Sequence, residues 1–144
     1  MNKEISGLIK ANAELKARRD ILVSMPGISD VTAAVILSDL PELGRIDGKA
    51  VAALAGVAPI NRESGFWKGR AFIRGGRREI RRTMFMPALV AIKYDLTMKK
   101  KYDELRSRGK SGKVALVAVM RKMLVTANAL LRDGRIWDAA APKS

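Results

Sequence analysis

Residues 113–131 place apolar side chains at the three-to-four-residue spacing of an α-helix, and no other stretch of the chain limits the fold as strongly. The apolar positions are Val117, Met120, Leu124, Ala127 and Leu131. This spacing makes one apolar stripe that has to be buried against other elements. The chain has 144 residues, of which 48% are hydrophobic, and that is enough for a single domain with a real core. We therefore expect a long helix here within one folded domain.

Most of the remaining sequence predicts further helices separated by glycine and proline. Predicted helices cover 3–24, 49–55, 77–94 and 99–107, and another begins after Ser29 or Asp30. In that helix Val31, Ala34, Val35 and Leu40 are expected to form the apolar side, and in 77–94 the apolar side is Ile80, Met84, Ala88 and Ala91. Pro87 predicts a kink in 77–94. Residues 66–74 are compatible with a small β-hairpin or an ordered loop. The predicted fold class is all-α, with about six helices.

The first predicted helix carries a heptad stripe. Leu8, Leu15 and Leu22 are seven residues apart, and Ile5 extends the stripe. Packing within the domain is favoured for Leu15 and Leu22, whereas Ile5 and Leu8 call for another helix, a second chain or an upstream segment. We accordingly divide the chain into the end of a coiled-coil or linker helix (1–19), a main domain (20–133) and a flexible tail (134–144).

The break between the first two helices has the form of a helix-hairpin-helix turn. Gly27 permits a tight turn, and the helix that follows presents free backbone N–H groups. Such groups, together with the helix dipole, suit a phosphate oxygen. Gly27, Ile28 and Ser29 are therefore candidate nucleic-acid-binding residues. An ordinary αα-hairpin with a Pro-Gly turn explains the sequence of residues 26–29 equally well.

The charge of the chain points to a polyanionic partner. The net charge is +14 and the isoelectric point is about 10.7, so DNA or RNA is the first candidate and an anionic membrane surface the second. Cysteine and histidine are absent, which excludes zinc fingers, disulfides and Ser-His dyads. The start is too charged for a signal peptide, and no apolar run is expected to reach membrane-spanning length. We expect a soluble cytoplasmic or nucleoid-associated protein whose partner is a nucleic acid, with no membrane partner.

Residues 56–82 gather eight Lys and Arg residues against two carboxylates. Arginine dominates, and its planar fork suits phosphate. Clustered guanidinium groups would also stabilise charge on a phosphorus attacked by the hydroxyl of Ser64. Composition alone favours a turn role for Ser64, and it identifies no general base. The candidate phosphate-binding residues are Arg62, Lys68, Arg70, Arg74, Arg77, Arg78, Arg81 and Arg82.

A second basic run surrounds the glycine-rich turn at 109–112. It could be a solvated helix face or a second contact with a nucleic-acid backbone. The run consists of Lys99, Lys100, Lys101, Arg106, Arg108, Lys110 and Lys113.

The methionines in the second half of the chain are expected to fill the core. They are Met84, Met86, Met98, Met120 and Met123.

An ordered series of motifs resembles the C-terminal domain of insertion-sequence transposases of the 116/110/902 family. The series is PGI at 26–28, LAGVAP at 54–59, Ser64-Gly65 eight residues after Gly56, GRAFIRGG at 69–76 and GKVALVAVMRKML at 112–124. The resemblance covers roughly 20–133. It implies a recombinase whose serine attacks the DNA backbone to form a phosphoserine intermediate, and Ser64 matches that serine.

The resemblance also implies parts that this sequence lacks. Full-length members resemble a RuvC-like domain with acidic metal ligands, a coiled coil and then this domain. A divalent metal such as Mg²⁺ is expected in that N-terminal domain, and no cofactor is expected in this chain. Family members imply a structured guide RNA and a dimer or tetramer. Pro87 departs from the family, whose corresponding helix is usually built without proline.

Three functions follow as alternatives. The first is the catalytic, DNA-binding domain of a transposase, inactive as an isolated fragment. The second is a helix-hairpin-helix module that binds DNA or RNA without catalysis. The third is an RNA-binding protein, for which aromatic residues are scarce at 5% of the chain.

Overall fold

The computed structural model describes residues 2–54, 56 and 75–138, and these form six helices and no strand. The helices are α1 (Asn2–Val23), α2 (Asp30–Asp39), α3 (Gly48–Leu54), α5 (Gly75–Tyr94), α6 (Leu96–Ser107) and α7 (Gly112–Asp133). The predicted all-α fold is therefore confirmed. The hairpin considered for 66–74 lies outside the described residues.

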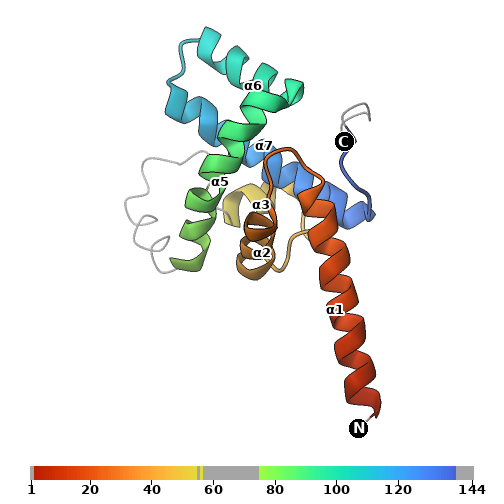
Figure 1. Cartoon of the computed structure of the whole chain (residues 1–144). Coiled ribbons are helices and arrows are strands. Elements are labelled where there is room, and N and C mark those ends of the chain that lie inside the picture. The colour runs from red at the N-terminus through yellow and green to blue at the C-terminus, as the bar shows by residue number, and fades with distance from the viewer. Residues whose placement is uncertain (1, 55, 57–74, 139–144) are drawn as a thin grey trace.

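Helix α7 is the centre of the domain, because it packs against α1, α3, α5 and α6 (Figure 1). Its residues Val119, Leu124 and Ala127 are fully buried. Helix α2 covers the other side of α5 and also touches α1. The predicted core face of α5 is confirmed, since Ile80, Met84, Ala88 and Ala91 are all fully buried.

The apolar character of α7 overturns one prediction. By length and composition this helix could cross a membrane, although no run of that length was expected. Two thirds (67%) of its most apolar window is buried inside the domain. The core helix of a globular protein has this same property.

Short polar side chains define where the helices begin. Ser29, Asp95 and Ser111 accept hydrogen bonds from the backbone N–H groups of the first turns of α2, α6 and α7. Asp47 does the same for α3, with 2.8 Å between its Oδ1 and the nitrogen of Ala50. These caps satisfy backbone donors that a helix start leaves without partners. Local sequence thus fixes the boundaries, and most predicted boundaries agree with the observed ones within a few residues.

Helix α1 extends out of the domain, with the N-terminus at its far end (Figure 1). Leu22 is fully buried, whereas Leu15 is 53% exposed and Leu8 is exposed as well. The prediction that Leu15 packs within the domain is therefore wrong. Near the domain, the Arg18 guanidinium donates a 2.7 Å hydrogen bond to the carbonyl of Leu43. The heptad stripe is thus divided between the core and solvent.

The predicted apolar side of α2 is confirmed only in part. Val35 packs against the core as predicted, whereas Val31 and Ala34 are exposed. Thr32, Ala33 and Ile36 are buried instead. The helix has only ten residues and is apolar on nearly every side. The spacing of its apolar residues therefore did not indicate which side would be buried. Leu40, at its C-terminal cap, is buried as predicted.

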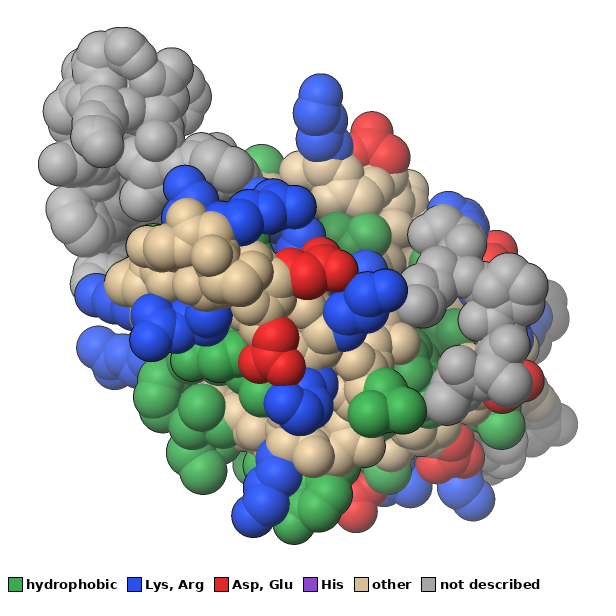
Figure 2. All heavy atoms as spheres, turned by 90° about the horizontal axis from the view of Figure 1, so that it is seen from above, with side chains coloured by type: hydrophobic (Ala, Val, Ile, Leu, Met, Phe, Trp, Pro, Cys, Tyr) green, Lys and Arg blue, Asp and Glu red, His purple; other side chains and the backbone are tan. Residues whose placement is uncertain are grey.

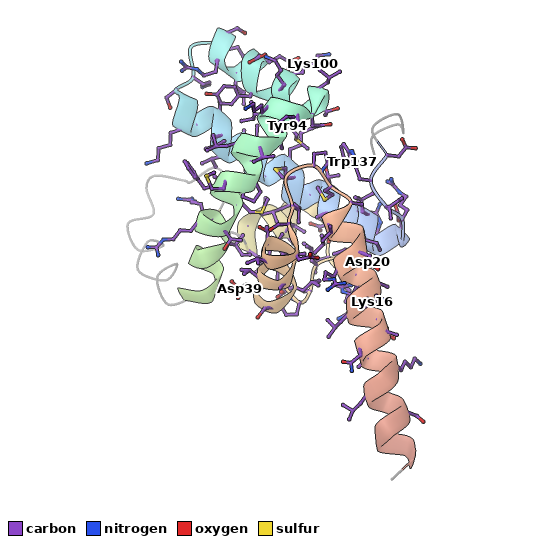
Figure 3. The ribbon with its side chains drawn as sticks, viewed as in Figure 1. Lys16, Asp20, Asp39, Tyr94, Lys100 and Trp137 are labelled. Carbon is purple, nitrogen blue, oxygen red and sulfur yellow. The ribbon has the colours of Figure 1, made fainter. Side chains whose placement is uncertain are left out.

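The first part of the predicted tail is fastened to the domain. The backbone nitrogen of Trp137 lies 2.8 Å from the Ser24 hydroxyl oxygen and donates to it. The indole packs against the core beside the C-terminal end of α1 (Figure 3). Gly134 ends α7 in the left-handed conformation, with a φ of 64°. The tail therefore follows a defined course as far as residue 138.

Candidate nucleic-acid interface

Helix α5 contains the described part of the basic stretch. Arg81 and Arg82 are exposed on it, and Nη2 of Arg81 donates a hydrogen bond to the carbonyl of Gly56. Gly75, the first residue of α5, is about 9 Å from Arg81 along the helix axis. Gly56 and Gly75 are the described residues on either side of 57–74, so both flanks of that segment lie at the N-terminal half of α5.

The other predicted residues of this stretch lie beyond what the structure describes. Arg77 and Arg78 belong to the first turn of α5, where only the backbone is described. Their phosphate-binding roles, like the nucleophilic role of Ser64, stay predictions. The residues outside the described part are Arg62, Ser64, Lys68, Arg70 and Arg74.

The turn at Gly27 is packed tightly against α5. A Cβ atom at Gly27 would lie 2.4 Å from the carbonyl oxygen of Pro87, and the φ of Gly27 is 88°. Ile28 is buried, while Ser29 is exposed and caps α2. The glycine of the predicted DNA-binding turn therefore has a clear packing role. Pro26 and Gly27 are partly exposed, and Ser29 is the more exposed side of the turn.

The charges around this turn are mixed. Asp30 lies in the first turn of α2, and its carboxylate is 3.9 Å from Nε of Arg19. Arg19 also approaches Asp20 at 3.6 Å. A carboxylate at a helix N-terminus stabilises the helix but repels a phosphate at the same place. Binding of a phosphate by Gly27, Ile28 and Ser29 stays a prediction, and Asp30 weakens it.

A second basic surface is formed by the end of α6, the turn at 108–111 and the start of α7. Arg108, Lys110 and Lys113 are exposed there. The Arg106 guanidinium donates a 2.9 Å hydrogen bond to the carbonyl of Lys110, which holds the turn to α6. Lys and Arg side chains are spread over the face of the molecule shown in Figure 2, with Asp and Glu side chains interspersed among them. This surface can contact two or more phosphates of a nucleic-acid backbone.

One feature of the structure was not predicted from the sequence. An open groove of about 730 Å³ lies between α5, α6 and α7. Its apolar lining includes Phe85 and Leu89 of α5, and Leu116 and Met120 of α7. Phe85 and Leu89 are four residues apart on a partly exposed side of α5, a spacing visible in the sequence. Met86 is also exposed on α5, so the prediction that it fills the core is wrong. The groove is completed by Arg81, Arg82, Tyr102, Gly112, Lys113 and Val117.

Charged groups near the two ends of the described chain have shifted pKa values. Burial, followed by the nearby charge of Arg45, lowers the pKa of the Arg18 guanidinium, and Glu14 acts in the opposite direction. Arginine is so basic that it remains protonated in proteins. Near the other end of the chain, a hydrogen bond from Arg132 lowers the pKa of the Asp133 carboxyl, and Arg135 adds to the effect. Asp133 therefore compensates part of the local positive charge.

Metal binding finds no support in the described part of the chain. Over 2–54, 56 and 75–138 no three Asp, Glu, His or Cys residues are grouped so that they could hold a metal ion. The divalent metal that the family resemblance implies therefore has no such group of ligands among the described residues.

The comparison with known sequences agrees with the motifs. The sequence profile of the transposase IS116/IS110/IS902 family matches residues 19–103. The match runs through the Gly27 turn, residues 56–82 and α5. It begins close to the point where α1 enters the domain.

Three relatives extend the similarity along the chain. The 43.6 kDa protein of insertion element IS110 from Streptomyces coelicolor is 32% identical over 142 residues, covering 97% of this chain and 35% of the relative. The pilin gene-inverting protein of Moraxella bovis is 29% identical, covering 96% of this chain and 44% of the relative. The 42 kDa protein of insertion element IS900 from Mycobacterium paratuberculosis is 32% identical, covering 84% and 31%. The chain thus spans between 31% and 44% of the length of these relatives.

Proposed function

Because the chain belongs to the IS116/IS110/IS902 transposase family, we propose that it is the DNA-binding C-terminal part of a transposase and supplies the attacking serine, Ser64. The observation that carries the proposal is the family match itself, whose range of 19–103 includes Ser64 and the basic residues around it. The Moraxella relative is named for gene inversion. That name is consistent with cutting and rejoining DNA strands.

In the proposed reaction the hydroxyl oxygen of Ser64 attacks a phosphorus of the DNA backbone. A P–O bond forms to the serine, and the bond to one deoxyribose oxygen breaks. The hydroxyl proton passes to a base or to solvent, and the leaving oxygen takes up a proton. Arg62, Lys68, Arg70 and Arg74 would hold the phosphate and stabilise the extra charge on its oxygens. Attack by a hydroxyl of a second strand would reverse these steps and release the serine.

The fold supports this proposal by placing both flanks of 57–74 at the basic half of α5. Arg81 holds Gly56 there through its hydrogen bond. Arg77, Arg78, Arg81 and Arg82 would extend phosphate contacts along the DNA on both sides of the scissile bond. Binding energy from such contacts helps to orient the reacting groups.

The other components of the reaction are proposed for the longer protein. A RuvC-like domain would supply a divalent metal such as Mg²⁺, which would assist the displacement at phosphorus. A structured guide RNA would align donor and target DNA, and a dimer or tetramer would hold two sites together. We propose that this chain alone binds DNA at the bacterial nucleoid without cutting it.

A non-catalytic helix-hairpin-helix module is the second candidate function. It is favoured by the exposed, Ser29-capped start of α2 after a tight glycine turn. In that case phosphate would be bound at Gly27, Ile28 and Ser29, and Ser64 would have no chemical role.

The test joins this chain to the N-terminal part of the Streptomyces coelicolor relative and uses a nicked DNA substrate that traps covalent intermediates. We expect a protein–DNA adduct that survives denaturing electrophoresis in the parent protein and is lost in Ser64→Ala. DNA affinity should change by less than about twofold, because one hydroxyl contributes little beside many charged contacts. Ser38→Ala, at an exposed serine of α2, is the control and should keep the adduct. Equal adduct in Ser64→Ala would contradict the nucleophile assignment and favour the non-catalytic module.

A further inference from the structure

Helix α5 has two apolar sides, although only one of them reaches the core. Ile80, Met84 and Ala88 are fully buried. On another side Phe85 is 47% exposed and Leu89 is 40% exposed. Met86 and Val90 of α5 are exposed as well. A surface helix normally has a single apolar stripe. A second stripe marks a surface that is covered by a partner.

The exposed side of α5 forms one wall of the groove described above. Leu116 and Met120 of α7 form a buried floor, and Tyr102 of α6 closes another side. The volume of about 730 Å³ lies within the usual range for sites that receive large apolar groups. Phe85 and Leu89 are about 6 Å apart along the helix axis. The groove is therefore shaped to receive several large side chains from one rod-like element.

The described charges that line the groove are positive. They are Arg81, Arg82 and Lys113, and among the described residues no carboxylate lines it. Arg81 donates to the carbonyl of Gly56, which is a neutral group. A partner with carboxylates beside its apolar side chains would complement this rim.

We propose that the groove docks an amphipathic helix of a protein partner, with large aliphatic or aromatic side chains on one side and Asp or Glu along its edges. This binding mode is known as helix-in-groove recognition, and it uses anchors at the i, i+3, i+4 and i+7 positions. The proposal is independent of the reaction at Ser64. Arg81, Arg82 and Lys113 of the groove are also candidates for nucleic-acid contact, so a docked helix and DNA would share these side chains.

Two other occupants fit the groove less well. A second copy would bring together two chains that each carry a net charge of +14, and like charges oppose such an approach. A nucleic acid would gain little from the aliphatic side chains of Leu89, Leu116 and Val117, since bases prefer aromatic stacking and hydrogen-bond donors. An acidic amphipathic helix satisfies both the apolar walls and the charged rim.

The test selects peptides that bind the whole chain from a displayed library of helical 16-residue sequences. We expect the selected peptides to have apolar residues at helical spacing and a net negative charge, and NMR shifts on binding to fall on Phe85, Leu89, Leu116 and Val117. Leu89→Asp should weaken the affinity about tenfold or more, as for the loss of a central interface anchor. Val31→Asp is the matched control, because Val31 is an exposed apolar residue on α2, and it should change nothing.

A charge exchange tests the rim separately. Lys113→Glu should weaken binding of the selected acidic peptide, and a peptide with Lys in place of its Glu residues should recover the loss. Lys100→Glu on α6 is the control and should have no such effect. Circular dichroism checks that each variant keeps its helices.

Four results would overturn the proposal. In the first, the library yields no peptide or only basic peptides, and in the second the NMR shifts fall on residues outside the groove. In the third, Leu89→Asp lowers the affinity for DNA or RNA whereas Val31→Asp does not. In the fourth, the chain forms a dimer that Leu89→Asp dissociates. A change in Trp67 emission caused by Leu89→Asp in a Trp137→Phe background would likewise assign the groove to a segment of the same chain. The covalent adduct of Ser64 is measured with DNA and without any peptide. Failure of the proposed reaction at Ser64 can therefore be told apart from failure of the proposed helix docking.

Discussion

Gly27 shows how one residue can satisfy a motif and a packing requirement together. A methyl group there would collide with the carbonyl oxygen of Pro87, at 2.4 Å. We predict that Gly27→Ala lowers the free energy of unfolding by about 3 kcal/mol, from backbone strain and the collision combined. Gly109→Ala is the control, since Gly109 has the same φ of 88° but nothing within 4 Å of an added Cβ. It should cost only about 1 kcal/mol.

Urea unfolding followed by circular dichroism would measure both variants. Equal losses in Gly27→Ala and Gly109→Ala would mean that the contact with Pro87 contributes nothing beyond backbone strain. The result also bears on function, because a glycine needed for packing is not by itself evidence of a phosphate site.

Asn128 is the buried polar residue of α7 that holds the segment before α3. Its Oδ1 accepts a 2.5 Å hydrogen bond from the nitrogen of Gly44, and its Nδ2 donates a 2.7 Å bond to the carbonyl of Ile46. We predict that Asn128→Ala lowers the free energy of unfolding by about 2–3 kcal/mol, because two backbone groups lose their partner. Thr126→Ala, which removes one bond to Lys122 within α7, should cost less than about 1 kcal/mol. Thermal unfolding would decide, and similar values for the two would refute the bridging role.

At the scale of the helix, α1 carries one heptad stripe with two different environments. Leu22 is fully buried, whereas Leu15 is 53% exposed. We predict that Leu22→Ala costs about 3 kcal/mol of stability and that Leu15→Ala costs less than about 0.5 kcal/mol in the monomer. Denaturant titration at low protein concentration would measure both. A large loss for Leu15→Ala that grows with protein concentration would instead show that Leu15 is buried between chains.

Helix positions could be predicted from the sequence because their signals are local. The stripe Ile80, Met84, Ala88 and Ala91 gave both the position of α5 and its buried side, as the structure confirms. Ser29 gave the start of α2 for the same reason, since a cap acts over three residues. The buried side of α2 could not be predicted, because Val31, Ala33 and Ile36 are apolar on different sides and only the packing on α5 and α1 selects among them.

At the scale of the whole molecule, charge is expected to govern binding to DNA. We predict that log K for duplex DNA falls steeply with log salt, by about 0.9 for each phosphate contacted. The double variant Arg108→Ala, Lys110→Ala should make this slope shallower by about one to two units if the α6–α7 surface contacts phosphates. Lys10→Ala, Lys16→Ala on the projecting part of α1 is the control. An unchanged slope in the first variant would mean that these side chains are only solvated.

The sequence by itself determined the helices, their caps, the positive charge and the family, because these depend on neighbouring residues or on totals. Predictions for Ser64 and the arginines around it also come from sequence, through the ordered motifs. Only the tertiary structure decided that Gly27 packs on Pro87, that Leu15 is exposed and that Phe85 and Leu89 face Leu116 and Met120 across a groove. Each of these depends on contacts between residues that are far apart in the chain, and such contacts exist only once the helices have packed.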